Sequence, residues 1–225
     1  KKIIAAAAAA AAKTTIIACD VSTPYDNVDV AEGTLRITIQ NDNHDNNSSI
    51  HTQRKGSSAE AFVNLVDAKF YDSTYTFRVI KGFVVQWGFR GGTQSSDKNG
   101  DGDGDRTKFD AASKRIREAD TTPISSSILN NQDNNRSGLL SNVRGTITMI
   151  SGSTGQVFIN LGNNARLDKE GTIPFGVLDE ASMMLADKIY TGYKGGQGQI
   201  KAIISNKIPT QFPKMNRIES CYRLE

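Results

Sequence analysis

Cysteine and histidine are scarce in this chain. Its 225 residues include two cysteines, Cys19 and Cys221, and two histidines, His44 and His51. Neither pair has the close spacing with other ligands that marks a structural zinc site, and no carboxylate spacing around the histidines indicates a catalytic metal. We therefore expect neither a conventional hydrolase nor a metal or other cofactor. The two cysteines could pair in an oxidising compartment or remain separate thiols, and the sequence leaves both alternatives open.

Long apolar runs and basic stripes are also missing. Beyond the N-terminus no segment approaches the roughly 20 apolar residues that a membrane-spanning helix needs. The chain has 27 Lys and Arg against 24 Asp and Glu, and its densest basic stretch, residues 114–117, is followed at once by Glu118 and Asp120. Nucleic-acid binders usually carry a sustained basic face with interleaved aromatic residues. We expect no stable membrane span and no nucleic-acid partner.

The N-terminus has the pattern of an export signal. Two lysines precede ten apolar residues, and the alanines at 10–12 fit a small-residue cleavage site. We assign residues 1–18 to this signal, although a capping helix or a disordered alanine tract remains an alternative, as does a lipid-attachment site at Cys19. N-glycosylation patterns in residues 46–49 and 135–137 agree with export. The secretory pathway or extracellular space is expected, with the periplasm or a plastid lumen as alternatives.

The rest of the chain indicates one mainly β domain over residues 33–225, after a polar linker at 19–32. A polar insertion at about 91–143 interrupts it and contains one short amphipathic segment at 108–119. Strand-like periodicity occurs at 34–40, 75–80, 83–89, 146–150, 157–161 and 217–224. Many short strands with few helices favour a closed antiparallel barrel capped by helices.

Two segments have helical periodicity. The first opens at Ser58 and has an apolar stripe through Phe62 and Leu65. The second spans 179–190, with Ala181, Met184, Leu185 and Ile189 predicted on one buried face. The Gly-rich run at 195–198 lacks the strand–loop–helix context of a phosphate loop and is interpreted as a turn.

Several long blocks resemble the cyclophilin family. They are residues 77–88 (FRVIKGFVVQWG), 144–149 (RGTITM), 156–168 (QVFINLGNNARLD) and 174–176 (PFG). The resemblance implies a closed eight-stranded antiparallel barrel with an α-helix over each mouth. It also implies a peptidyl-prolyl cis-trans isomerase that binds proline-containing peptide segments of exported proteins and assists their folding. We expect a monomer.

The resemblance also assigns roles to individual residues. Arg78 corresponds to the catalytic donor, and Gln86 corresponds to the residue that orients its guanidinium. The predicted substrate-binding residues are Phe83, Val84, Met149, Gln156, Phe158 and Leu167. A positive charge at Arg78 inside an apolar strand block is costly to bury without a purpose, which favours a functional role.

Some positions depart from the family pattern. Many members of the family have an aromatic residue before the Leu-Asp pair, where this chain has Arg166. The loop from Ile150 to Gly155 is six residues long, shorter than is typical of the family. These departures keep open a second hypothesis, a catalytically weak or inactive module that binds proline peptides.

The insertion contains a weak calcium-loop pattern. Asp97, Asn99, Asp101, Asp103 and Asp105 occupy alternate positions, with Gly102 at the sixth. The twelfth position, which should supply a bidentate carboxylate, is Lys108. An acidic solvated linker is therefore favoured over a metal site.

Overall fold

The computed structural model describes residues 14–23, 31–39, 58–90, 140–150, 153 and 155–225. Several predictions lie outside these residues: the apolar part of the export signal, the two histidines, the glycosylation patterns, the helix at 108–119 and the calcium-loop residues. They stay predictions.

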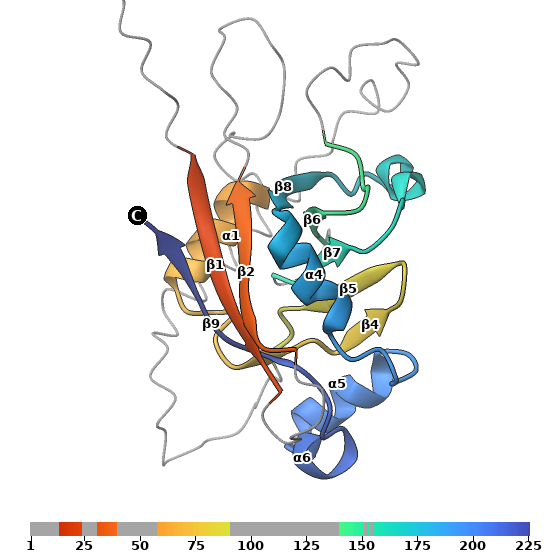
Figure 1. The fold of residues 1–225 in the computed structure, drawn as a ribbon. Coiled ribbons are helices and arrows are strands. Elements are labelled where there is room, and N and C mark those ends of the chain that lie inside the picture. Colours follow the sequence, from red (N-terminus) through yellow and green to blue (C-terminus); the bar gives the residue numbers. More distant parts are fainter. Residues whose placement is uncertain (1–13, 24–30, 40–57, 91–139, 151–152, 154) are drawn as a thin grey trace, which may run out of the picture.

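One curled antiparallel sheet organises the described part of the chain (Figure 1). Its nine strands run in the order β3-β9-β1-β2-β8-β6-β7-β5-β4. Their bounds are β1 Thr15–Ser22, β2 Gly33–Ile39, β3 Thr74–Tyr75, β4 Arg78–Ile80, β5 Val84–Trp87, β6 Thr146–Met149, β7 Val157–Asn160, β8 Pro174–Leu178 and β9 Arg217–Leu224.

The first strand revises the N-terminal boundary. β1 begins at Thr15 and pairs along its length with β2 and β9, so the boundary predicted between residues 18 and 19 falls inside a strand. Ile17 and Val21 of this strand belong to the hydrophobic core. Residues 15–22 are therefore part of the sheet, because their apolar side chains alternate inward as the strand period requires.

The sheet is a half-barrel of nine strands rather than the closed eight-stranded barrel that was expected. The segment predicted as one strand at 75–80 divides at Thr76 and Phe77, because its two ends pair with different neighbours. β3 pairs with β9, whereas β4 pairs with β5, so the two edges of the sheet lie on one short chain segment. No strand ladder joins these edges within the described residues.

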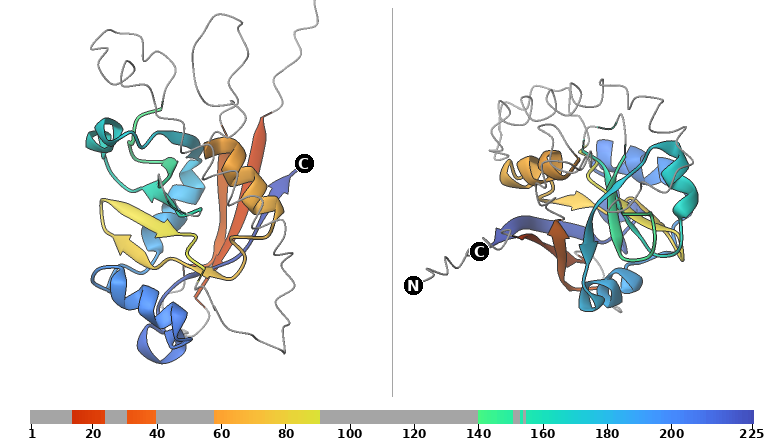
Figure 2. Two further views of the ribbon diagram at one scale, coloured as in Figure 1. Left: turned by 180° about the vertical axis from the view of Figure 1, so that it is seen from behind. Right: turned by 90° about the horizontal axis from the view of Figure 1, so that it is seen from above.

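Helix α1 (Ser58–Asp67) confirms the first predicted helix. Its buried stripe includes Phe62 and Leu65, both with no exposed area. The centroid of the Phe62 ring is 4.9 Å from the ring centroid of Phe175 in β8 and 5.1 Å from that of Tyr71. This helix covers one side of the curled sheet, opposite α4, as the front and back views show (Figures 1 and 2).

Helix α4 (Glu180–Lys188) confirms the second predicted helix and part of its predicted buried face. Asp179 caps it by accepting a hydrogen bond from the Ser182 backbone N–H at 2.8 Å. Leu185 and Ile189 are buried as predicted, together with Met183, whereas Ala181 is exposed and Met184 is 57% exposed, contrary to the prediction. The face is set by contact with β2: the Ser182 hydroxyl accepts from the Arg36 backbone N–H at 2.7 Å, and Met183 and Leu185 belong to the core.

Two short helices were not predicted. α5 (Gln197–Ile204) starts inside the Gly-rich run interpreted as a turn, and α6 (Ile208–Gln211) follows it. Together they enclose a second small core around Ala202, Ile208 and Met215. Tyr75 of β3 packs against this second core, which therefore lies beside the β3 edge of the sheet.

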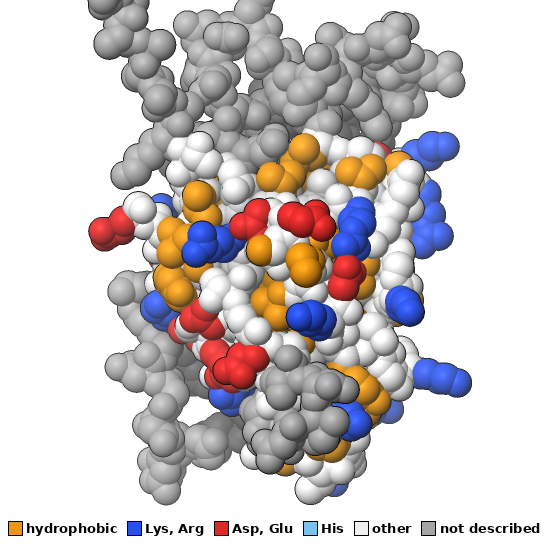
Figure 3. Space-filling view, in the orientation of Figure 1, with side chains coloured by type: hydrophobic (Ala, Val, Ile, Leu, Met, Phe, Trp, Pro, Cys, Tyr) orange, Lys and Arg blue, Asp and Glu red, His pale blue; other side chains and the backbone are white. Residues whose placement is uncertain are grey.

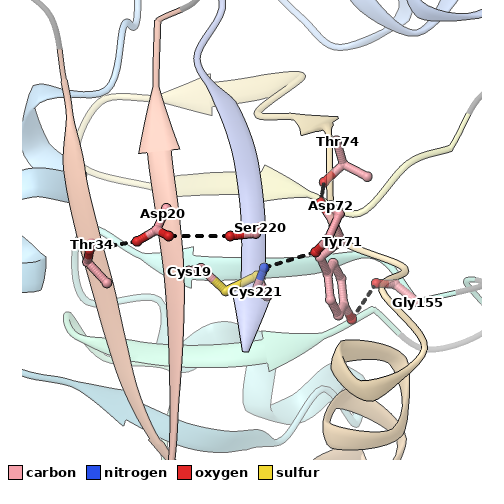
Figure 4. The surroundings of a disulfide bond; sticks show 9 residues. All are labelled: Cys19, Asp20, Thr34, Tyr71, Asp72, Thr74, Gly155, Ser220 and Cys221. Carbon is pink, nitrogen blue, oxygen red and sulfur yellow. Dashed lines mark hydrogen bonds between the residues drawn. A yellow bond between two sulfur atoms is a disulfide. The ribbon is translucent and has the colours of Figure 1, made fainter. Parts of the chain in front are cut away.

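Cys19 and Cys221 form a disulfide between β1 and β9 (Figure 4). They are direct cross-strand partners, and both are fully buried. Asp72 accepts a hydrogen bond from the Cys221 backbone N–H at 3.0 Å. Because Cys19 is bonded to Cys221, it has no free thiol for lipid attachment, which removes that alternative.

Within the described ranges, none of the helices has both the length and the apolar character needed to cross a bilayer. The same residues contain no group of three or more His, Cys, Asp or Glu side chains placed to hold a metal ion.

Candidate active site

Four neighbouring strands bring the central predicted residues into one row on the outer face of the sheet. Arg78 in β4 lies opposite Gln86 in β5, Gln86 lies opposite Phe158 in β7, and Phe158 lies opposite Thr148 in β6. Cross-strand partners point to the same face, and successive residues point to opposite faces. The intervening residues, such as Val85, are in the core. The pairing register of these four strands therefore places the row on the outer face.

A chain of hydrogen bonds fixes the polar end of this row. Arg78 donates through Nη1 to Gln86 Oε1 at 3.2 Å, and Gln86 donates through Nε2 to Gln156 Oε1 at 3.0 Å. Gln86 is only 6% exposed, so its amide can orient the guanidinium with little competition from water. The backbone at Gly196 lies against the aliphatic part of Arg78, where an added Cβ would be 3.5 Å from Arg78 Cβ.

The Phe83 ring lies beside Arg78. The guanidinium carbon of Arg78 is 5.5 Å from the ring centroid, within cation–π range. Phe83 is half-buried, so part of the ring is open to solvent. Phe158 and Val84 lie on the same outer face but are almost fully covered. Phe83 therefore provides most of the accessible apolar surface next to the positive charge, and Phe158 and Val84 contribute only a small part.

Leu167 lies in the 3-10 helix η1 (Ala165–Glu170) and is half-buried. The same short helix brings the guanidinium carbon of Arg166 to 4.9 Å from the Phe83 ring centroid, so η1 borders the apolar surface. Asn164, just before η1, donates to the Phe83 carbonyl at 2.8 Å. η1 is thus held to the chain segment that carries Phe83.

A buried network of asparagines holds η1 in place. Asn142 Nδ2 donates to Asp168 Oδ1 at 2.8 Å, and Thr148 donates its hydroxyl to Asn142 Oδ1 at 2.7 Å. Asn160 also donates to Asn142 Oδ1 at 3.1 Å and accepts from Asn164 at 2.8 Å. Because such groups are costly to leave unpaired when buried, the network fixes η1 relative to β6 and β7.

Met149 does not lie with the other predicted pocket residues. It pairs with Val157, and both are in the core, on the face opposite Phe158. Ile150, which was not among the predicted pocket residues, lies on the outer face instead. Its N–H bonds to the Gln156 carbonyl at 2.9 Å, which continues the β6–β7 register and places it on the outer face. The two-residue period of the strand was the available signal, because Thr148 and Ile150 share a face.

Tyr71 supports the end of the loop that leads to Gln156. Its hydroxyl donates to the Gly155 carbonyl at 2.9 Å (Figure 4). Complete burial raises the pKa of Tyr71 well above its ordinary value, so the hydroxyl stays protonated and remains a donor. Gly155 has a positive φ of 99°, and a Cβ there would lie 2.7 Å from Leu65 Cδ1, so the position requires glycine.

The arrangement suits a substrate that needs binding and electrostatic stabilisation rather than covalent attack. An apolar side chain can rest on Phe83 and Phe158, while the Arg78 guanidinium presents donors beside it. The glutamine pair supplies neutral hydrogen-bonding groups along the same edge. None of the residues in this row is a hydroxyl or thiol nucleophile paired with a base, which is the arrangement that acyl transfer uses.

Comparisons with known proteins agree on one family. Residues 34–215 match the family model described as cyclophilin type peptidyl-prolyl cis-trans isomerase/CLD. The chain is 31% identical over 176 residues to peptidyl-prolyl cis-trans isomerase A of Dickeya dadantii, a match that covers 74% of this chain and 77% of that protein.

Two solved structures of a Cryptosporidium parvum cyclophilin type peptidyl-prolyl cis-trans isomerase are also similar. One is 12% identical with a TM-score of 0.48, and the match covers 95% of this chain and 99% of that chain. The other, determined in the presence of the dipeptide Ala-Pro, is 14% identical with a TM-score of 0.46 and covers 93% and 99%.

Proposed function

This chain belongs to the cyclophilin-type peptidyl-prolyl cis-trans isomerase family, and on that basis we propose that it interconverts the cis and trans forms of Xaa-Pro bonds at the Arg78 site. The observation that carries the proposal is the hydrogen-bonded chain from Arg78 through Gln86 to Gln156, next to the exposed part of Phe83. Charge, orientation and an apolar surface thus occur together on one face.

The reaction requires these three elements. Rotation about the Xaa-Pro bond has a barrier of roughly 20 kcal/mol, because amide resonance is lost midway. At that point the prolyl nitrogen becomes pyramidal and regains its lone pair, which accepts a hydrogen bond. A guanidinium N–H from Arg78, already aimed by Gln86, stabilises this state more than either planar ground state. No covalent bond changes, so no nucleophile is needed.

The apolar residues hold the proline ring. Phe83 offers its half-buried ring, and the nearly covered Phe158 and Val84 lie on the same outer face of the sheet. Ile150 and Gln156, which are paired at the end of β6 and β7, border this surface and place a backbone edge near the substrate. A peptide held here has its prolyl nitrogen directed toward Arg78, and fixing this geometry lowers the entropic cost of reaching the transition state.

The test is an isomerisation assay on the purified chain with a short Xaa-Pro peptide. Wild type should accelerate the exchange, and Phe158→Ala should reduce kcat/KM about tenfold, since it removes the ring beneath the proline site. Tyr222→Phe, on the exposed side of β9, is the matched control and should leave the rate unchanged. A rate equal to the uncatalysed one for wild type, with folding verified, would reject the isomerase function.

A second candidate uses the same surface for binding without turnover. It is favoured by the short segment between Met149 and Gln156, which leaves less backbone to align a peptide. Peptide titration distinguishes the two functions: binding that depends on Phe158, together with uncatalysed isomerisation, supports this candidate. Turnover above background excludes it.

We further propose that the protein is exported and acts on exported proteins as they fold. The buried disulfide between Cys19 and Cys221 supports this proposal, because such bonds persist mainly in oxidising compartments. Sequencing the mature N-terminus from native material, together with thiol labelling under denaturing conditions, tests it. A signal removed before Thr15 and unreactive cysteines are expected. An unprocessed protein with two free thiols would contradict it.

A further inference from the structure

Two guanidinium groups share one aromatic ring at the edge of the proposed site. The guanidinium carbon of Arg78 lies 5.5 Å from the centroid of the Phe83 ring, and that of Arg166 lies 4.9 Å from it. They reach the ring from different elements, Arg78 from β4 and Arg166 from η1. Arg166 is exposed, whereas Arg78 is half-buried. A peptide resting on Phe83 therefore meets a second positive charge besides Arg78.

Neither cation is neutralised by a carboxylate of the described residues. Other arginines in these ranges have such partners: Arg144 pairs with Asp187, Arg217 with Glu219, and Arg223 with Asp67. Arg166 and Arg78 form no ion pair in the same set.

Asp168, which follows Leu167, forms hydrogen bonds with other residues instead of an ion pair with either arginine. Asp168 accepts from the Ser141 hydroxyl and from both the backbone N–H and the side-chain amide of Asn142. These bonds occupy its two oxygens. In Figure 3, Lys and Arg side chains predominate along the edge formed by η1 and the β4–β5 hairpin.

We propose that Arg166 is a specificity-determining residue that favours Xaa-Pro segments with an Asp or Glu next to the proline. The inference rests on the proposed function, because it assumes that the proline lies against Phe83. A carboxylate on the neighbouring residue supplies the counter-charge that no carboxylate of the described residues provides, while the ring keeps its cation–π contact. A lysine at the same place meets two like charges.

The size of the preference follows from the exposure of Arg166. An ion pair in contact with solvent contributes little and is screened by salt, which corresponds to a two- to fivefold difference in affinity. Repulsion of a lysine peptide adds a factor of similar size. The ratio of affinities for Glu and Lys peptides is the product of these two factors and should therefore be roughly fourfold to 25-fold in dilute buffer. It should approach one in 1 M salt, where charges are screened beyond about 3 Å.

The experiment measures binding and turnover with matched peptides. Each peptide has one proline, preceded or followed by Glu, Gln or Lys, and Kd is obtained by fluorescence titration while isomerisation is followed separately. Arg166→Gln removes the charge, and Arg166→Lys retains it. Lys169→Gln, an exposed cation of the same 3-10 helix, is the control for net charge.

The expected result is a Glu preference at one of the two flanking positions that falls to within twofold in Arg166→Gln and persists in Lys169→Gln. Equal affinities for Glu and Lys peptides in wild type, or a preference that survives Arg166→Gln, would overturn the inference. The isomerase function fails separately, through absent turnover on all peptides. In that case the ratio of dissociation constants still decides the role of Arg166.

Discussion

Removing the hydroxyl of Tyr71 tests how the site is supported from the core. Tyr71→Phe keeps the ring, which packs 5.1 Å from Phe62 and 5.0 Å from Phe70, and deletes only the group that donates to the Gly155 carbonyl. The carbonyl loses its partner in a region where Gly155 is itself buried. The substitution therefore isolates one hydrogen bond beneath the residue that precedes Gln156.

The expected cost combines a lost hydrogen bond with an unsatisfied buried carbonyl. Such changes typically cost about 1–3 kcal/mol. Because the ring contacts are retained and no cavity larger than one oxygen forms, the lower half of that range applies, about 1–2 kcal/mol. With a urea dependence of about 2 kcal/mol per molar, the unfolding midpoint should fall by roughly 0.5–1 M at an unchanged slope.

The assay is urea unfolding followed by tryptophan fluorescence, since the single tryptophan, Trp87, is fully buried in the same core. Tyr222→Phe serves as the control, because Tyr222 is 37% exposed on β9. The side-chain amide resonances of Gln86 and Gln156 should shift in Tyr71→Phe alone. An unchanged midpoint together with unmoved amide resonances would refute the claim that Tyr71 holds this loop.

Three further predictions concern stability. Replacing Cys19 and Cys221 together by alanine should lower the free energy of unfolding by about 3–5 kcal/mol, because the bond spans 202 positions of sequence; a midpoint equal to that of the oxidised wild type would contradict this. Gly155→Ala should destabilise the protein more than Tyr71→Phe, because φ is positive at this position and the new Cβ would meet Leu65. Thermal unfolding of the two variants gives the order. A smaller loss of stability in Gly155→Ala than in Tyr71→Phe would argue against tight packing around Gly155. Asp179→Ala should cost about 1 kcal/mol at neutral pH through the lost helix cap. Hydrogen bonding from Ser182 lowers the pKa of Asp179, so the cap contributes above the unfolded-state pKa and is lost as pH falls through the folded one. The difference between variant and wild type should therefore shrink in acid, and a difference that persists there would point to another cause.

The resemblance named residues that the structure brings together where cross-strand register places them. Arg78, Gln86 and Phe158 come together because they occupy opposed positions in neighbouring strands. The sequence blocks that contain them could be recognised by their resemblance to cyclophilin motifs. The same reasoning, applied one residue further, would have replaced Met149 by Ile150. A residue-by-residue transfer from a motif does not consider which face of the strand a position occupies.

Where the sequence-based prediction of the fold was wrong, the reason is the same each time: the structure depends on contacts between segments that are distant in sequence. Polar residues such as Asp20 and Ser22 made the start of the domain look like a linker, yet Asp20 accepts from Thr34 at 2.7 Å within the sheet. The division of 75–80 into two strands depends on β9, which lies far away in sequence. The inward face of α4 depends on its contact with β2, where Ser182 accepts from the Arg36 backbone N–H, and single-residue hydrophobicity does not reveal this contact.

Two-dimensional exchange NMR of an Xaa-Pro peptide, with catalytic amounts of protein, tests the role of Arg78 most directly. Wild type should produce cis–trans exchange cross-peaks, Arg78→Ala should exchange about 100-fold more slowly, and Arg78→Lys should recover only part of the rate, because it keeps the charge but loses the planar donor fork that Gln86 orients. Equal exchange in wild type and Arg78→Ala, with peptide affinity unchanged, would contradict the account.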